Sequence, residues 1–172
     1  MIAGANGILP LSVPVKKKHG TKSVMKDVQI DYTKPWQKEH WKSITAAYAS
    51  APYFEFLFDY YLPLYKKKTK YLLDLNLQAL EATLSILNTP LNIRFTDQFS
   101  PVPSEGDLRE SIHPKKDIQA NIPDFRPTRY YQVFEERHGF TANLSILDLV
   151  FNEGTQAPDI LKTSIKKSRS PI

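Results

Sequence analysis

His40 is the residue of this chain that is best suited to acid–base chemistry. The unperturbed pKa of histidine lies near neutrality, so its imidazole can both accept and donate a proton at physiological pH. At 3.6 residues per turn, His40 shares one helix face with Trp36, Ile44, Ala47 and Tyr48. An imidazole among such neighbours either walls a site or is a hydrogen-bonded core residue, and the second case is more common.

Asp148 is the second candidate for a catalytic group, because it lies in the apolar segment NLSILDLVFNEG at residues 143–154. A carboxylate that is buried in such a segment needs a partner, or its pKa rises. Ser145 precedes Asp148 by three residues, as in a capping box, so helix capping can also explain this carboxylate.

The two ends of the same segment carry further polar residues. Asn143 and Ser145 are both candidates for the N-cap of a helix, and Gly154 can end that helix in a left-handed conformation. Asn152 and Glu153 then present an amide and a carboxylate at the end of the helix, where a ligand could bind. Helix termination alone explains the glycine.

Aromatic side chains are concentrated in residues 36–58, which hold both tryptophans of the chain. Several tyrosines could stack against a sugar or a base, although aromatic residues at helical spacing more often fill a core; these are Tyr48, Tyr53, Tyr60, Tyr61 and Tyr65. The four histidines never occur four residues apart or as an H-x-H pair, so no metal site is expected. The sequence has no phosphate-binding glycine motif and no nucleophile elbow, and it leaves the cofactor unknown.

Periodic apolar residues predict the helices that position these groups. The first helix is expected at residues 35–49, with Thr33 as a candidate N-cap and Pro35 in the first turn. A second helix follows, and Pro63 is expected to kink or break it. The third helix, at residues 70–87, is rich in leucine and is expected to be the most buried.

Two segments near the N-terminus predict strands. Residues 8–15 are β-prone but contain two prolines, which indicates an edge strand or an extended arm. Residues 24–32 alternate apolar and polar side chains, so the two segments together predict an antiparallel ribbon. A further short strand is expected at residues 91–95.

The chain is therefore expected to form one α+β, helix-rich domain with a small antiparallel β-ribbon or sheet over residues 1–163. Residues 100–128 are rich in proline and lack apolar periodicity, which predicts a long surface loop that is disordered at about 105–119. Residues 164–172 are polar and basic, and a mobile tail is expected there.

The composition limits the classes of function. The absence of cysteine excludes a disulfide framework and a thiolate nucleophile and suits a reducing compartment, so a cytoplasmic location is expected. We find no signal peptide or membrane-spanning run, so no membrane insertion is expected. The net charge of +5 is spread over separate lysine clusters without a recognition motif, so no nucleic-acid partner is expected. The sequence leaves the oligomeric state unknown.

Several motifs follow one another along nearly the whole chain: IAGANG with LSVPV, DVQIDYTKPWQKEHWKSITAAYASAPYFEF, LYKKKTKYLLDLN, YYQVF and GFTANLSILDLVFNEG. Their order resembles that of the WbqC-like protein family. The most specific parts are Trp36 with His40-Trp41, Ala47-Tyr48 with Pro52-Tyr53-Phe54, and residues 143–154. The members that it resembles carry an additional aromatic and arginine-rich segment before Ile2, so this chain is expected to lack that segment.

The resemblance implies a bacterial protein of O-antigen or other surface-polysaccharide biosynthesis. The activity that it implies is a transferase that moves glycine or another aminoacyl or acyl group to an amino sugar, on a nucleotide-sugar or amino-sugar substrate. In this reading His40 and Asp148 are the catalytic residues, and His40 deprotonates the acceptor amine. The implied substrate-binding residues are Trp36, Trp41, Tyr48, Tyr53, Asn143, Ser145, Asn152 and Glu153. The alternative is a non-catalytic scaffold protein that binds a sugar or another protein.

Overall fold

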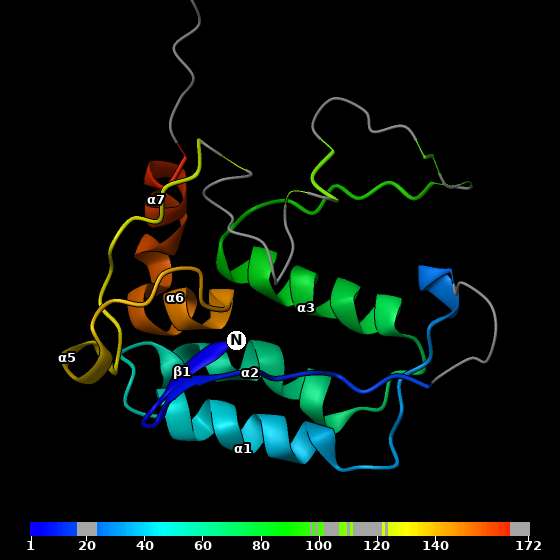
Figure 1. Cartoon of the computed structure of the whole chain (residues 1–172), viewed down its shortest axis with the longest axis horizontal. Coiled ribbons are helices and arrows are strands. Elements are labelled where there is room, and N and C mark those ends of the chain that lie inside the picture. The colour runs from blue at the N-terminus through cyan, green and yellow to red at the C-terminus, as the bar shows by residue number, and fades with distance from the viewer. Residues whose placement is uncertain are drawn as a thin grey trace, which may run out of the picture. The chain divides into compact units, whose positions relative to one another are not determined.

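The computed structural model describes residues 1–16, 24–96, 98, 100, 101, 107–109, 111, 122 and 124–165 (Figure 1). The chain divides into two compact units, Met1–Leu91 with Arg129–Ala157 and Asn92–Thr128 with Pro158–Ile172. The first unit contains the elements β1 (Ile2–Gly4), β2 (Gly7–Leu9), η1 (Met25–Asp27), α1 (Trp36–Tyr48), α2 (Phe54–Lys66), α3 (Leu72–Ile86), α5 (Glu135–His138), α6 (Ile146–Glu153) and η2 (Gly154–Gln156). The expected α+β, helix-rich architecture is confirmed.

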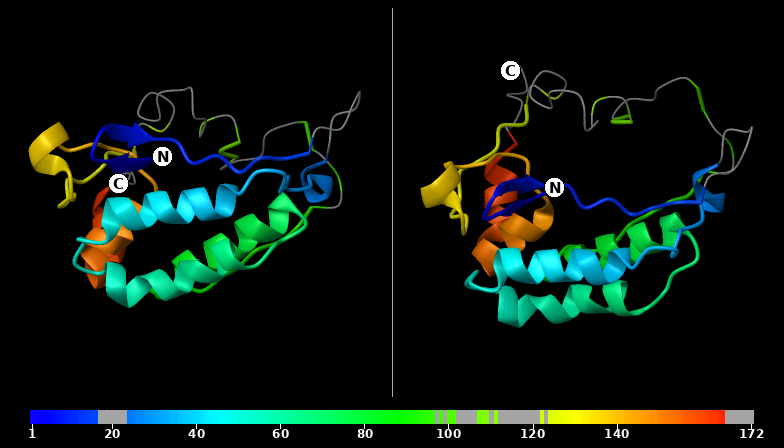
Figure 2. Two further views of the ribbon diagram at one scale, coloured as in Figure 1. Left: turned by 90° about the horizontal axis from the view of Figure 1, so that it is seen from below. Right: turned by 60° about the horizontal axis from the view of Figure 1, so that its bottom comes forward.

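Helices α1 and α2 form a helical hairpin and lie side by side in both views of Figure 2. The predicted first helix agrees with α1 to within one residue at each end, although Pro35 and not Thr33 is at its N-cap position. Helix α2 continues through Pro63, so the expected break is absent. Pro63 removes only the hydrogen bond to the carbonyl of Asp59, an exposed residue in the middle of the helix.

The most buried helix is α6, and the expectation that the third helix is the most buried was wrong. In α3 only Leu75 and Thr83 are buried, and Leu80 is 41% exposed. In α6 every residue from Leu147 to Asn152 is buried. The leucines of α3 are spread around the helix, and only part of them can face its neighbour α2 in the first unit.

Extended segments pair at three places among the described residues of the first unit, and one of them is an antiparallel bridge between Gln29 and Tyr71. Strands β1 and β2 form an antiparallel hairpin with Ile2 opposite Leu9, which the sequence did not predict. The predicted ribbon is reduced to an antiparallel bridge between Val15 and Ile30. Residues 91–95 form no strand, so that prediction was wrong; a strand requires a partner backbone, and none pairs with this segment among the described residues.

The second unit contains most of α7 (Ala157–Thr163), which begins at the last residue of the first unit. After α7, the Ser164 carbonyl accepts a hydrogen bond from Arg126 N (2.8 Å), and Ile165 pairs with Phe125. Most of the predicted loop and the tail from residue 166 lie outside the described residues, and the single domain over residues 1–163 stays a prediction. Within the described part, no helix has the length and apolar character to cross a membrane.

Candidate functional site

His40 and Ser145 line the same pocket, although they are far apart in the sequence. The pocket has a volume of about 200 Å³, and its lining residues come from the N-terminal segment, α1, α2, α3 and the start of α6. Trp36 lines it one turn before His40, with the two rings edge to face at 5.1 Å between centroids. Tyr65 of α2 also lines it, at 6.4 Å from His40. Three predicted site residues, Trp36, His40 and Ser145, are therefore brought together.

The environment of His40 keeps its imidazole neutral at pH 7. Burial lowers the pKa of His40 below its ordinary value of 6.5, while the Ser12 backbone and the Glu39 carboxylate act in the opposite direction. Burial also raises the pKa of Tyr65 to about 12, so the phenol stays protonated. Among the described side chains that line the pocket, His40 is thus the one that can accept a proton near neutrality.

Ser145 is held at the pocket by the capping of α6. Its Oγ accepts a hydrogen bond from Leu147 N at 3.4 Å, which confirms Ser145 as the N-cap. Its own N–H donates to the carbonyl of Met1 at 2.8 Å, which ties the start of α6 to the residue that precedes β1. Asn143, the other candidate cap, is exposed and has a positive φ of 59°.

Asp148 lies in a buried hydrogen-bond network and is not among the residues that line the pocket. Its Oδ2 accepts hydrogen bonds from the Tyr130 hydroxyl (2.8 Å) and from Gln132 Nε2 (3.0 Å). Gln132 also exchanges two hydrogen bonds with the backbone of Thr141. Because the Ser145 N–H bonds to Met1, the carboxylate does not complete a capping box, and capping does not explain Asp148.

Burial disfavours the charged form of the Asp148 carboxyl group. Burial raises the pKa of Asp148, while hydrogen bonding and electrostatic interaction with Tyr130, Tyr48 and Gln132 act in the opposite direction. The Tyr48 hydroxyl interacts with this carboxylate, although neither it nor Oδ1 forms a hydrogen bond of good geometry within the described residues. Since Tyr48 is on α1, the network links α6 to the helix that carries His40.

The end of α6 packs on the start of α2. Gly154 ends the helix with a positive φ of 52°, but its ψ of −116° differs from the left-handed helical conformation that the sequence predicted. A Cβ added there would lie 2.3 Å from Cδ1 of Tyr53. Asn152 Nδ2 donates to the Asp148 carbonyl at 2.7 Å, and Glu153 accepts from Tyr131 N at 3.0 Å. Tyr53, Asn152 and Glu153 therefore hold this end together, and none of them lines the pocket of His40.

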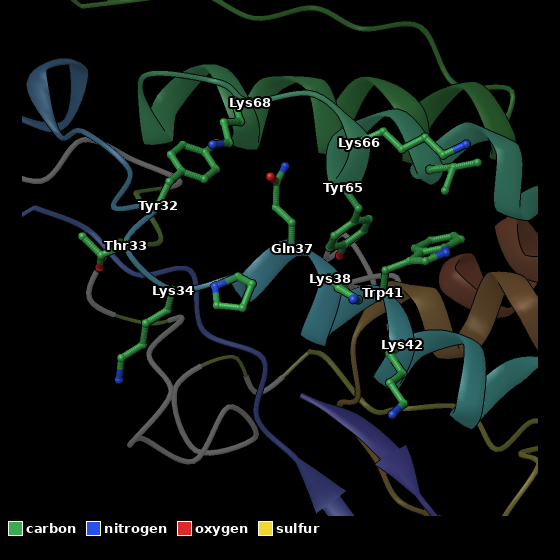
Figure 3. A pocket seen from close by; sticks show the side chains of 12 residues that line it. Tyr32, Thr33, Lys34, Gln37, Lys38, Trp41, Lys42, Tyr65, Lys66 and Lys68 are labelled. Carbon is green, nitrogen blue, oxygen red and sulfur yellow. The ribbon is translucent and has the colours of Figure 1, made fainter.

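A larger groove lies between the N-terminal part of α1 and the C-terminal part of α2 (Figure 3). Its volume is about 680 Å³, and Trp41, a predicted binding residue, lines it. Tyr65 lines both this groove and the pocket of His40. The remaining lining residues are Tyr32, Thr33, Lys34, Pro35, Gln37, Lys38, Lys42, Leu62, Lys66 and Lys68. We name this set of twelve residues the lysine groove.

Sequence reasoning missed the lysine groove, because its lysines come from two helices and the segments that flank them. Lys34, Lys38 and Lys42 recur every four residues, and Trp41 lies beside the last of them. This spacing places Lys38 and Lys42 on one face of α1, with Lys34 just before the helix, and was the signal that could have found the site. Lys66 and Lys68 join them only through the packing of α2 against α1.

Comparison with known proteins identifies the family to which this chain belongs. Residues 1–107 match the WbqC-like protein family. The chain belongs to this family. In the WbqC-like region lie β1, β2, α1, α2, α3, His40 and the whole lysine groove, whereas Ser145 and α6 follow it. The chain is also 25% identical to "Uncharacterized protein Rv1507c" of Mycobacterium tuberculosis (strain ATCC 25618 / H37Rv), over 94% of this chain and 79% of that protein. No solved structure matches the chain.

Proposed function

We propose that this protein is a transferase of bacterial surface-polysaccharide biosynthesis, which transfers glycine or another aminoacyl or acyl group to the amine of an amino sugar. Membership in the WbqC-like family supports a polysaccharide-related role in general terms. The observation that carries the proposal further is the pocket that His40 shares with Ser145. It joins two motifs that are more than a hundred residues apart in the sequence.

His40 acts as the general base in this reaction. The amine nitrogen of the sugar attacks the carbonyl carbon of an activated acyl donor, such as an ester or a thioester. The new C–N bond forms, the bond to the leaving group breaks with its electron pair, and the proton of the nitrogen passes to the imidazole. The lowered pKa of His40 keeps the imidazole in the form that accepts this proton at pH 7.

The other residues of the proposed site either contact the substrate or hold the helices of the site in position. Trp36 and Ser145 line the pocket and contact the small group that is transferred, since about 200 Å³ is below the roughly 300–1,000 Å³ of most ligand sites. Asp148 and Tyr48 position α6 relative to α1, and Asp148 acts as a positioning residue. Trp41 binds substrate from the lysine groove.

The decisive assay measures acyl transfer directly. The purified chain is incubated with a glycyl thioester and a UDP-linked amino sugar, and the mass increase of the sugar is followed by mass spectrometry. We expect the His40→Ala variant to lose about 100-fold or more in rate, the range of a general base. His138→Ala is the matched control, because His138 is exposed and lies outside the pocket.

Two outcomes would contradict this proposal in different ways. Wild-type transfer by a folded His40→Ala variant would reject His40 as the base. Absence of transfer with every acyl donor, together with binding of the amino sugar in a thermal-shift assay, would favour the non-catalytic scaffold. The thermal shift reports binding because a ligand selective for the folded state raises the melting temperature.

A further inference from the structure

The lysine groove brings together lysine side chains that have no acidic partner among the described residues. Five of its twelve residues are lysines, and none of its described residues is acidic. Among the described residues, none of these lysines forms an ion pair within 4.0 Å. Asp31 is near Lys34 but does not line the groove. A groove of this charge attracts an anion, and the lysines reach it as mobile point charges that suit phosphate.

Aromatic rings also line the groove. Trp41 and Tyr65 are half-buried, with ring centroids 5.3 Å apart. Figure 3 shows them between Lys42 of α1 and Lys66 of α2. At the other end of the groove, the Lys68 ammonium lies over the Tyr32 ring at 5.4 Å. Planar rings beside cations fit a ligand that has a planar ring and phosphate groups.

The walls of the groove are fixed by hydrogen bonds that do not involve its lysine ammonium groups. Gln37 Nε2 donates to the carbonyls of Leu64 (2.9 Å) and Lys67 (2.7 Å), which attaches α1 to the last turn of α2. The Tyr32 hydroxyl donates to the Thr69 carbonyl at 2.8 Å and accepts from Thr69 N at 2.9 Å. The groove is therefore formed before a ligand arrives, which reduces the entropic cost of binding.

We propose that the lysine groove binds the nucleoside diphosphate part of a nucleotide-linked sugar, with the phosphates against the lysines and the base against Trp41 and Tyr65. The proposal rests on the proposed function, in which the amino sugar is carried on such a precursor. Its volume of about 680 Å³ is within the range of ligand sites, whereas the pocket of His40 is too small for a nucleotide. Tyr65 lines both spaces, so the sugar extends from the groove past this ring towards His40.

Calorimetric titration of the whole chain tests this assignment without any reaction. The probes are UDP, dTDP, ADP and GDP, with uridine and pyrophosphate as the two halves of one of them. We expect at least one diphosphate to bind about tenfold or more tightly than its nucleoside, and its affinity to fall with added salt. We expect Lys38→Gln with Lys42→Gln to weaken that diphosphate about tenfold or more, and to leave the nucleoside unchanged.

Lys26→Gln is the matched control, because Lys26 is exposed and does not line the groove. All substituted lysines are on the surface, so the variants are expected to keep the melting temperature of the wild type. An equal loss of affinity in the Lys26→Gln variant would overturn the assignment, as would diphosphates that bind no better than nucleosides. A short single-stranded oligonucleotide that binds more tightly than every diphosphate would also overturn it.

The titration and the acyl-transfer assay together separate this inference from the proposed function. Diphosphate binding that depends on Lys38 and Lys42, in a protein without transfer activity, supports the groove and rejects the transferase. Acyl transfer that is unaffected by the two substitutions, in a protein that binds no diphosphate, rejects the groove and keeps the transferase.

Discussion

Gly154 gives the sharpest test of how α6 is held against α2. Its φ of +52° lies in the region that side chains rarely adopt, and an alanine there costs roughly 1–3 kcal/mol in backbone strain. The added Cβ would also lie 2.3 Å from Cδ1 and 2.5 Å from both Cγ and Cε1 of Tyr53. Overpacking of this kind costs a further ~1–3 kcal/mol. We therefore expect Gly154→Ala to lower the free energy of unfolding by roughly 2–6 kcal/mol.

The Tyr53 ring cannot move away cheaply, because its backbone is anchored. Tyr53 N donates to the Phe151 carbonyl at 2.9 Å, so a shift of Tyr53 disturbs the last turn of α6. The Phe151 ring in turn contacts Tyr48, Phe54 and Tyr61, at 5.0–5.8 Å between centroids. The overlap at Gly154 is therefore transmitted to the core of the first unit.

Urea unfolding of five proteins isolates the contribution of the overlap: the wild type, Gly154→Ala, Tyr53→Ala, their combination and Gly139→Ala. Gly139→Ala is the control for strain alone, because Gly139 also has a positive φ (70°) but has nothing within 4 Å of an added Cβ. Combining Gly154→Ala with Tyr53→Ala removes the overlap, so the double-mutant cycle should give a favourable coupling of roughly 1–3 kcal/mol. Equal losses for Gly154→Ala and Gly139→Ala, or a coupling near zero, would refute the reasoning.

Two further predictions concern buried polar groups. Burial raises the pKa of Asp148 above 3.8, so the folded state holds this proton more tightly than the unfolded chain. The free energy of unfolding of the wild type, relative to that of Asp148→Asn, should therefore increase as the pH falls from 7 through the raised pKa towards 3.8. Urea unfolding of both proteins at several pH values measures this difference. A difference that does not change with pH would contradict the prediction. Tyr32→Phe removes the hydroxyl that bonds Thr69 N and O, and should cost about 1–2 kcal/mol in urea unfolding; an unchanged midpoint would show that water replaces these bonds.

Helices α1, α2, α3 and α6 could be predicted from the sequence because their signals are local, whereas the short helices α5 and α7 were not predicted. The apolar period of α1 and the capping of α6 by Ser145 are both set by residues within a few positions of one another. The hairpin of β1 and β2 escaped prediction because each strand has only three residues, too few to show an alternating pattern. The apolar periodicity of a helix also does not show which element packs on each of its faces. For this reason α3 was expected to be more buried than it is.

The partners of a buried polar group are harder to predict. Asp148 reads as a capping residue because Ser145 lies three positions before it, and that local pattern was misleading. Its real partners, Tyr130 and Gln132, are 18 and 16 residues away and reach it only through the fold. The resemblance to a family implied that residues 143–154 lie beside His40, although no local pattern connects them. Ser145 and Leu147 of this segment line the His40 pocket, whereas Asp148 and Asn152 do not.

The two spaces that Tyr65 lines have complementary chemistry. The described lining of the His40 pocket has no lysine or arginine, so it offers a base but no side-chain cation for a phosphate. The lysine groove has five lysines, but its described lining contains no histidine or carboxylate that could accept a proton at pH 7. The proposed transferase would use both spaces, with the nucleotide in the lysine groove and the amine in the His40 pocket. On this reasoning, loss of the lysines weakens substrate binding, whereas loss of His40 slows the reaction of substrate that is already bound.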